Sequence, residues 1–120
     1  MDFRRETMER AVRAVQLSPL TLEALEKMGE QSVSLSSLGG VSAQQAKLTH
    51  QTLSELAVES ELMWLFRVGV VRREVDGQGI TDCFRLTPLG HQVLTSLRQA
   101  PVPALSLLDQ VHNTLARWLP

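Results

Sequence analysis

The chain has 120 residues, of which 43% are hydrophobic and 21% charged, so it can bury one domain core without disulfides or metals. One cysteine (Cys83) and three scattered histidines exclude an internal disulfide and show no zinc-ligand spacing, so we expect neither a metal nor a cofactor. The net charge of −1 argues against affinity for nucleic acid over the whole surface, and the lack of a long apolar run or signal peptide predicts a cytoplasmic protein outside the membrane.

The first elements are predicted to be two helices. Residues 3–16 place apolar side chains at helical spacing, with arginines and glutamates elsewhere. Ser18 followed by Pro19 is typical of a helix start, because serine can cap free amides and proline suits the first helical position. We expect this second helix to run to about Met28 and to stop at Gly29.

A short strand and a short helix are expected next. Residues 32–36 alternate polar and apolar side chains, as a strand does. After two glycines, Ser42 stands three residues before Gln45, which is the spacing of a capping box for a helix through about Leu48.

The longest helical pattern covers His50 to about Val68. Thr49 is a candidate cap for it, and the pair Thr52 and Glu55 offers a competing start. Gly69 is expected to end this helix.

A β-hairpin and a helix follow. Residues 70–75 form a β-type run, Asp76–Gly79 has turn chemistry, and residues 80–86 alternate as a returning strand. Thr87 before Pro88 then predicts the cap and first residue of a helix that runs through Leu97.

The end of the chain is predicted to be a separate helix beyond a short proline-containing linker. The expected organisation is one domain, made of an N-terminal helix (1–17), a central part (18–98), a linker (99–103) and a C-terminal helix (104–120).

Two stretches of the central part resemble the winged helix-turn-helix superfamily, and the MarR-like bacterial regulators most closely. They are Leu62-x-x-Leu65-x-x-x-Gly69-Val70-Val71-Arg72-Arg73 and Phe84-Arg85-Leu86-Thr87-Pro88-Leu89-Gly90. The likeness spans about residues 20–98. It implies a mainly α fold with a small β-hairpin, that is, a winged-helix core with added N- and C-terminal helices.

The resemblance implies that the helix from His50 to Val68 enters the major groove of DNA and that the hairpin contacts its backbone. Gln51 can read adenine, and Thr52 or Ser54 can bind phosphate or a base edge. The expected DNA-binding residues are Lys47, His50, Gln51, Thr52, Ser54, Arg72, Arg73 and Arg85.

The uneven distribution of charge along the chain leaves two hypotheses about function open. Residues 20–61 hold six glutamates against two lysines, and Glu55, Glu59 and Glu61 are expected on or near the groove-facing surface, where they would repel phosphate. Residues 62–98 hold five arginines against three acids, although the hairpin arginines can pair locally with Glu74 or Asp82 instead. The leading hypothesis is therefore a dimeric DNA-binding transcriptional regulator, and the alternative is a winged-helix protein-interaction module.

Each terminal helix carries an apolar stripe that must be buried, and the resemblance implies that these helices build a homodimer. The alternative is that both helices pack on the core of their own chain. The expected interface residues are Phe3, Val12, Val15, Leu108, Val111, Leu115 and Trp118. We expect no catalytic residue, since no phosphate-binding glycine loop and no serine, histidine and acid motif stands in the required context. Cys83 is interpreted as structural because the neighbouring Asp82 gives no electropositive setting.

Overall fold

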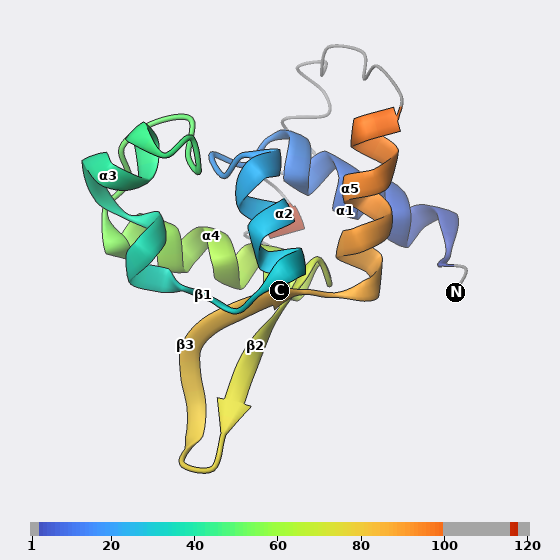
Figure 1. Cartoon of the computed structure of the whole chain (residues 1–120). Coiled ribbons are helices and arrows are strands. Elements are labelled where there is room, and N and C mark those ends of the chain that lie inside the picture. Colours follow the sequence, from blue (N-terminus) through green and yellow to red (C-terminus); the bar gives the residue numbers. More distant parts are fainter. Residues whose placement is uncertain (1–2, 100–115, 118–120) are drawn as a thin grey trace.

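A computed structural model of the chain describes residues 3–99 and 116–117. In chain order the main elements are α1 (Arg5–Gln16), α2 (Leu22–Glu30), β1 (Val33–Ser34), the 3-10 turn η1 (Leu35–Leu38), α3 (Gly40–Gln45), α4 (Glu55–Arg67), β2 (Val71–Asp76), β3 (Gly79–Leu86) and α5 (Pro88–Gln99). The fold is mainly helical with a small antiparallel β-hairpin, as the sequence predicted at this level, and β1 adds a third strand in the order β1-β3-β2. Figure 1 shows the β2–β3 hairpin reaching away from the helices as an arm.

The hairpin prediction is confirmed. Val71 pairs with Leu86 at the base of the hairpin, and Asp76 pairs with Gly79 at its tip. The Gln78 amide donates to the Asp76 carboxylate over 2.7 Å, and Gly79 has a φ of +119°, which favours glycine. The register of the strand pairing shifts between Arg73 and Val75, at the middle of the arm.

The predicted start of α5 is also confirmed. The Thr87 hydroxyl accepts a hydrogen bond from the Gly90 amide at 3.0 Å and lies against the backbone carbonyls of Gly69 and Val70. Pro88 takes the first helical position. This one threonine therefore caps α5 and fastens it to the chain that enters β2.

The expected start of the second helix at Ser18 and Pro19 is wrong. Thr21 is the cap: its side-chain oxygen accepts from the Ala24 amide at 3.1 Å and donates to the Lys47 carbonyl at 2.7 Å. Leu20 forms an antiparallel bridge with Thr49. The segment before α2 is thus held extended by a distant part of the chain, and local capping chemistry does not decide its conformation.

The same bridge explains why the long helix starts later than His50. Thr49 is engaged with Leu20, and the His50 amide donates to the Pro19 carbonyl over 2.8 Å. Neither Thr49 nor Thr52 is the cap, because the Ser54 hydroxyl accepts from the Ala57 amide at 3.1 Å.

Three smaller boundaries also differ from expectation. Gly29 lies inside α2, which continues to Glu30. The strand predicted over residues 32–36 is limited to Val33–Ser34, because the chain turns at once into η1. Ser42 lies inside α3, whose cap position is Gly39, so the capping box is not formed.

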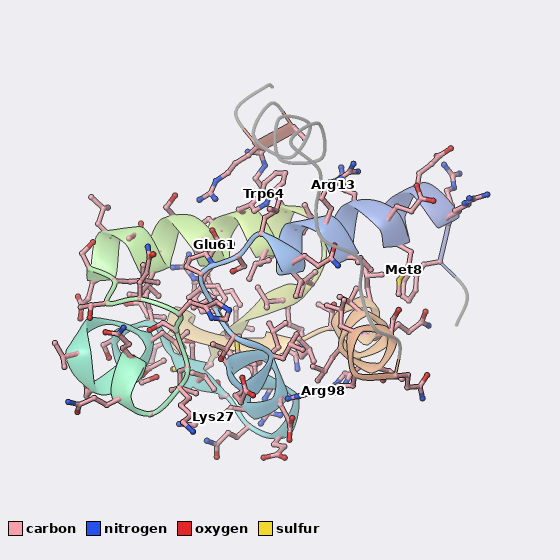
Figure 2. The ribbon with its side chains drawn as sticks, turned by 90° about the horizontal axis from the view of Figure 1, so that it is seen from above. Met8, Arg13, Lys27, Glu61, Trp64 and Arg98 are labelled. Atoms are coloured by element: carbon pink, nitrogen blue, oxygen red, sulfur yellow. The ribbon has the colours of Figure 1, made fainter. Side chains whose placement is uncertain are left out.

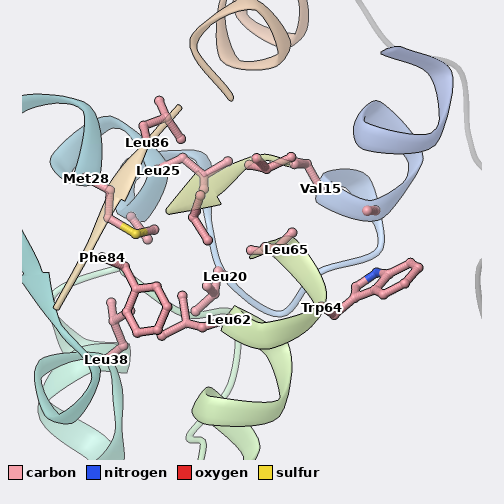
Figure 3. Packing of buried hydrophobic residues seen from close by; sticks show 14 of the residues in the cluster. Val15, Leu20, Leu25, Met28, Leu38, Leu62, Trp64, Leu65, Phe84 and Leu86 are labelled. Carbon is pink, nitrogen blue, oxygen red and sulfur yellow. The ribbon is translucent and has the colours of Figure 1, made fainter. Parts of the chain in front are cut away.

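The core is gathered around α4 and the base of the hairpin, as Figure 3 shows for Leu62, Phe84, Leu38 and Met28. Helix α1 joins this core through Ala11, Ala14 and Val15. Burying each large apolar side chain stabilises the fold by about 1.5–3 kcal/mol. Because Val15 belongs to the core of its own chain, it is not available to the predicted dimer interface.

Candidate functional site

The outward face of α4 carries large apolar side chains between carboxylates. Leu56 is 77% exposed and Phe66 is also exposed, while Met63 between them is half-buried. Glu55 and Glu59 are exposed in the first two turns of the helix. This face is therefore apolar with an acidic border at its N-terminal end.

The polar residues predicted to read DNA lie before α4 and not within it. His50, Gln51, Thr52 and Ser54 belong to the loop between α3 and α4, and all four are exposed. The Thr52 hydroxyl donates to the Gln44 side-chain oxygen over 2.5 Å, which holds this loop against α3.

Lys47, at the start of the same loop, is exposed and has a φ of 64°. This left-handed conformation strains a residue with a side chain. The loop thus presents a lysine and several polar groups to solvent at the N-terminal end of α4.

Two hairpin arginines share one carboxylate. Arg72 and Arg85 are cross-strand partners, and Glu74 lies between them. The Arg72 guanidinium is 2.8 Å from one Glu74 carboxylate oxygen, and the Arg85 guanidinium is 2.5 Å from the other. A single glutamate therefore offsets much of the positive charge on this side of the hairpin.

Arg73 lies on the opposite side of the hairpin, as strand alternation predicts. Its guanidinium is 3.2 Å from the Asp82 carboxylate and stands over the Phe84 ring at 5.3 Å from the centroid. All three predicted hairpin arginines are thus paired locally. Residues 71–86 hold three arginines against Glu74, Asp76 and Asp82, so the arm has no excess positive charge.

The tip of the hairpin is apolar. Val75 and Ile80 are cross-strand partners, and their exposed fractions are 69% and 72%. The neighbouring Asp76 is also exposed, so no basic side chain accompanies this apolar pair at the tip.

A buried carboxylate on α4 differs from the expectation for this helix. Glu61, predicted on the exposed surface, is only 3% exposed. The Arg117 guanidinium donates to it over 2.9 Å and also to the Ser60 hydroxyl over 2.9 Å. Sequence reasoning did not single out Arg117, and no local signal could have done so, because 56 residues separate it from Glu61.

The remaining predicted interface residues fall into two groups. Phe3 and Val12 are half-buried and line an open groove of about 490 Å³ along α1, together with Met8, Arg13 and Ser96 of α5. Four further residues lie outside the described part of the chain: Leu108, Val111, Leu115 and Trp118.

The described residues hold neither a cluster of metal ligands nor a helix that could span a membrane. Within them, no three histidine, cysteine, aspartate or glutamate side chains gather as metal ligands. Cys83 is a free, half-buried thiol on β3. Over the same part of the chain, no helix has both the length and the apolar character needed to cross a membrane.

The family model described as Npun_F0494-like matches residues 1–117. No curated protein and no solved structure matches the chain significantly. Since the family model covers nearly all of the sequence, the chain belongs to the Npun_F0494-like family.

Proposed function

We propose that the central part of this chain is a winged-helix domain. The support is the order of its elements: α2, β1, α3, α4, and then the β2–β3 hairpin, with β1 added beside β3. Three helices followed by a two-stranded arm is the arrangement of that superfamily, in which the third helix and the arm contact a partner. In this chain α4 takes the place of the third helix.

We further propose that the domain is a protein-interaction module that docks through the outward face of α4. The observation that carries this proposal is Leu56, a large apolar side chain that is 77% exposed in the first turn of the helix. Phe66 and Met63 extend the same surface toward the other end of α4. Burial of each such side chain by a partner would contribute about 1.5–3 kcal/mol.

The charges around this face indicate the chemistry of the partner. Glu55 and Glu59 border Leu56, so a protein surface with an apolar centre and lysine or arginine at its rim would be complementary. A phosphate backbone would meet two carboxylates instead. The hairpin arginines would do little to offset this repulsion of phosphate. Arg72 and Arg85 both pair with Glu74, and Arg73 pairs with Asp82.

Double-stranded DNA is the second candidate partner, as for a dimeric transcriptional regulator. One observation favours it: Lys47, His50, Gln51 and Thr52 form an exposed polar loop at the N-terminal end of α4. In this arrangement the loop would contact DNA and the arm would contribute only after its ion pairs open.

We also propose a homodimer that buries the groove along α1. Phe3, Met8 and Val12 give this groove an apolar lining, and Arg5 and Arg13 border it. In a two-fold dimer the same groove from each chain would contribute to the interface.

Site-specific photo-crosslinking in the source cell tests the proposed docking face. A photoreactive phenylalanine analogue at position 56 should give a discrete protein adduct, and the same analogue at the exposed Gln31 should not. Glu59→Lys should weaken the adduct at position 56 because it reverses the charge beside Leu56.

Duplex titration by the purified chain separates the two candidates. At ~50 mM salt, where phosphate contacts are strongest, we expect no duplex binding. Binding with a steep salt dependence, together with no adduct at position 56, would replace the protein-docking proposal with the DNA one.

A further inference from the structure

Arg117 is held on α4 by contacts to both its side chain and its backbone. Its guanidinium donates to the Glu61 carboxylate and to the Ser60 hydroxyl, each over 2.9 Å. The Arg67 guanidinium in turn donates to the Arg117 carbonyl over 3.1 Å. Three side chains within two turns of α4 therefore contact one residue near the chain end.

The Glu61 carboxylate is suited to this contact. The residue is 3% exposed, whereas its neighbours Glu59 and Ser60 are exposed. A buried carboxylate is unfavourable unless it is paired, and a guanidinium pairs with it better than an ammonium does because its donors form a planar fork. The adjacent Ser60 hydroxyl accepts a further donor of the same fork.

Trp64 lies beside Arg67, one of the residues that contact Arg117. Figure 3 shows its ring pointing away from Leu62 and Phe84, and Figure 2 shows it on the side of the molecule where residues 116–117 lie. The residue is nevertheless only 4% exposed, and the Arg67 guanidinium lies 5.6 Å from the ring centroid. Within the described part of the chain, the buried Trp64 indole N–H has no hydrogen-bond partner.

We propose that Ser60, Glu61, Trp64 and Arg67 form an arginine-binding site on α4, which the chain's own Arg117 occupies as a tethered ligand. An arginine-bearing peptide segment of another protein is the external ligand that would replace it. A ligand in the same chain competes at an effective concentration on the order of millimolar, so an external segment binds when the tethered arginine is removed or outcompeted.

The site also affects the outward face of α4. Ser60 and Arg67 are exposed residues of this helix, and both contact Arg117. Arg117 therefore contacts two side chains that lie beside Leu56 and Met63 on this face. The arginine site itself does not depend on the proposed docking function, because it is defined by contacts within one chain.

The test uses the full-length chain and a peptide with its own C-terminal sequence. The probe is a fluorescein-labelled peptide of residues 114–120, with phenylalanine in place of Trp118, and the readout is fluorescence anisotropy. We expect it to bind the Arg117→Ala chain about tenfold more tightly than the wild-type chain, whose own arginine competes. Adding Glu61→Gln to Arg117→Ala should weaken binding about tenfold, because the charged acceptor is lost.

Two controls make the result specific to a guanidinium. A probe with lysine at position 117 keeps the charge and should bind about fivefold more weakly, because it lacks the planar fork. Glu59→Gln removes an exposed carboxylate from the same helix and should change binding less than about twofold.

In a Trp118→Phe background Trp64 is the remaining tryptophan, so its emission should shift to longer wavelength on Arg117→Ala.

Three results would each overturn the proposal. They are no binding of the probe to the Arg117→Ala chain at ~1 mM, equal binding of the lysine probe, and equal binding to the folded Glu61→Gln variant. If Glu61→Gln lowers the melting temperature too far, Ser60→Ala takes its place and should weaken binding of the arginine probe only. Failure of the crosslinking experiment at position 56 would leave these measurements intact, since they involve this chain and its own sequence alone.

Discussion

Gly90 on α5 offers the sharpest test of how the helices are fixed to the hairpin. A Cβ placed on this residue would lie 2.2 Å from the Val70 carbonyl oxygen and 2.7 Å and 2.8 Å from Leu86 Cδ1 and Cγ. The Leu86 side chain can rotate, but the Val70 carbonyl is backbone at the entry to β2. Gly90→Ala therefore requires α5 to move away from the hairpin.

The expected loss of unfolding free energy in Gly90→Ala is the sum of destabilising and stabilising effects. Inserting a methyl group into a packed site typically costs about 1–3 kcal/mol. At position 90 the methyl group meets backbone, which cannot rotate away, so we take the cost as about 3 kcal/mol. Moving α5 also weakens the 3.0 Å contact of the Thr87 hydroxyl with the Val70 carbonyl, which contributes about 1 kcal/mol. Alanine is favoured over glycine inside a helix by about 1 kcal/mol. The expected net loss of unfolding free energy is thus about 3 kcal/mol.

Urea denaturation followed by far-UV circular dichroism measures this loss, with the slope of the transition expected to stay unchanged. The melting temperature should fall by about 12 °C for a chain of this length. Gly77→Ala is the matched control: the described chain places no atom within 4 Å of its Cβ, so the change should be below about 0.5 kcal/mol. A Gly90→Ala chain as stable as Gly77→Ala would refute the close approach of α5 to β2.

Four further changes test other parts of the structure. Ser54→Ala should cost about 1 kcal/mol in urea denaturation because it removes the α4 cap, whereas Ser42→Ala should cost less than about 0.5 kcal/mol. Lys47→Gly should raise the unfolding free energy by about 0.5–1 kcal/mol by relieving the φ of 64°, and Lys47→Ala should give no gain. Glu74→Gln frees two hairpin arginines, so this variant should bind a duplex measurably at ~50 mM salt, where the wild-type chain is expected not to bind, and an unchanged titration would show that these ion pairs do not limit binding. The full-length chain should sediment as a dimer at ~100 μM and Phe3→Asp as a monomer; a wild-type monomer would exclude the proposed self-association.

The hairpin and the start of α5 could be predicted because their signals are local. The glycine turn near Asp76 and the Thr87–Pro88 pair each contain the groups that make the structure, within three or four residues. Such signals survive folding when no distant segment competes for the same groups.

The starts of α2 and α4 could not be predicted because distant residues use the candidate caps. The backbone of residues 19–21 pairs with that of residues 48–50. Thr49 therefore belongs to a β-bridge, although the sequence alone indicated that it could cap the next helix. Thr21 and Ser54 then cap the two helices a few residues later. The shift moves the predicted DNA-reading residues from a helix face into a loop, so one non-local pairing changes the functional interpretation.

Charge composition was a poor guide to the site for a related reason. The excess of arginines over residues 62–98 favoured an anion-binding arm, yet Glu74 and Asp82 lie where the strand register brings Arg72, Arg73 and Arg85 against them. Composition counts charges, whereas binding depends on which charges are left without an opposite neighbour.

The acidity of the surface around α4 also depends on which charges are paired. Glu61 was expected to add to the acidic exposed face, but it is buried and paired with Arg117, so the acidity of that face comes from Glu55 and Glu59 at one end of the helix. The rest of the outward face consists of Leu56, Met63 and Phe66. These apolar side chains can form neither hydrogen bonds nor ion pairs with a phosphate backbone. An acidic end, an apolar middle and a carboxylate paired with Arg117 lie along one helix, so the proposed partner is one that brings both apolar groups and guanidinium groups, as a protein segment does.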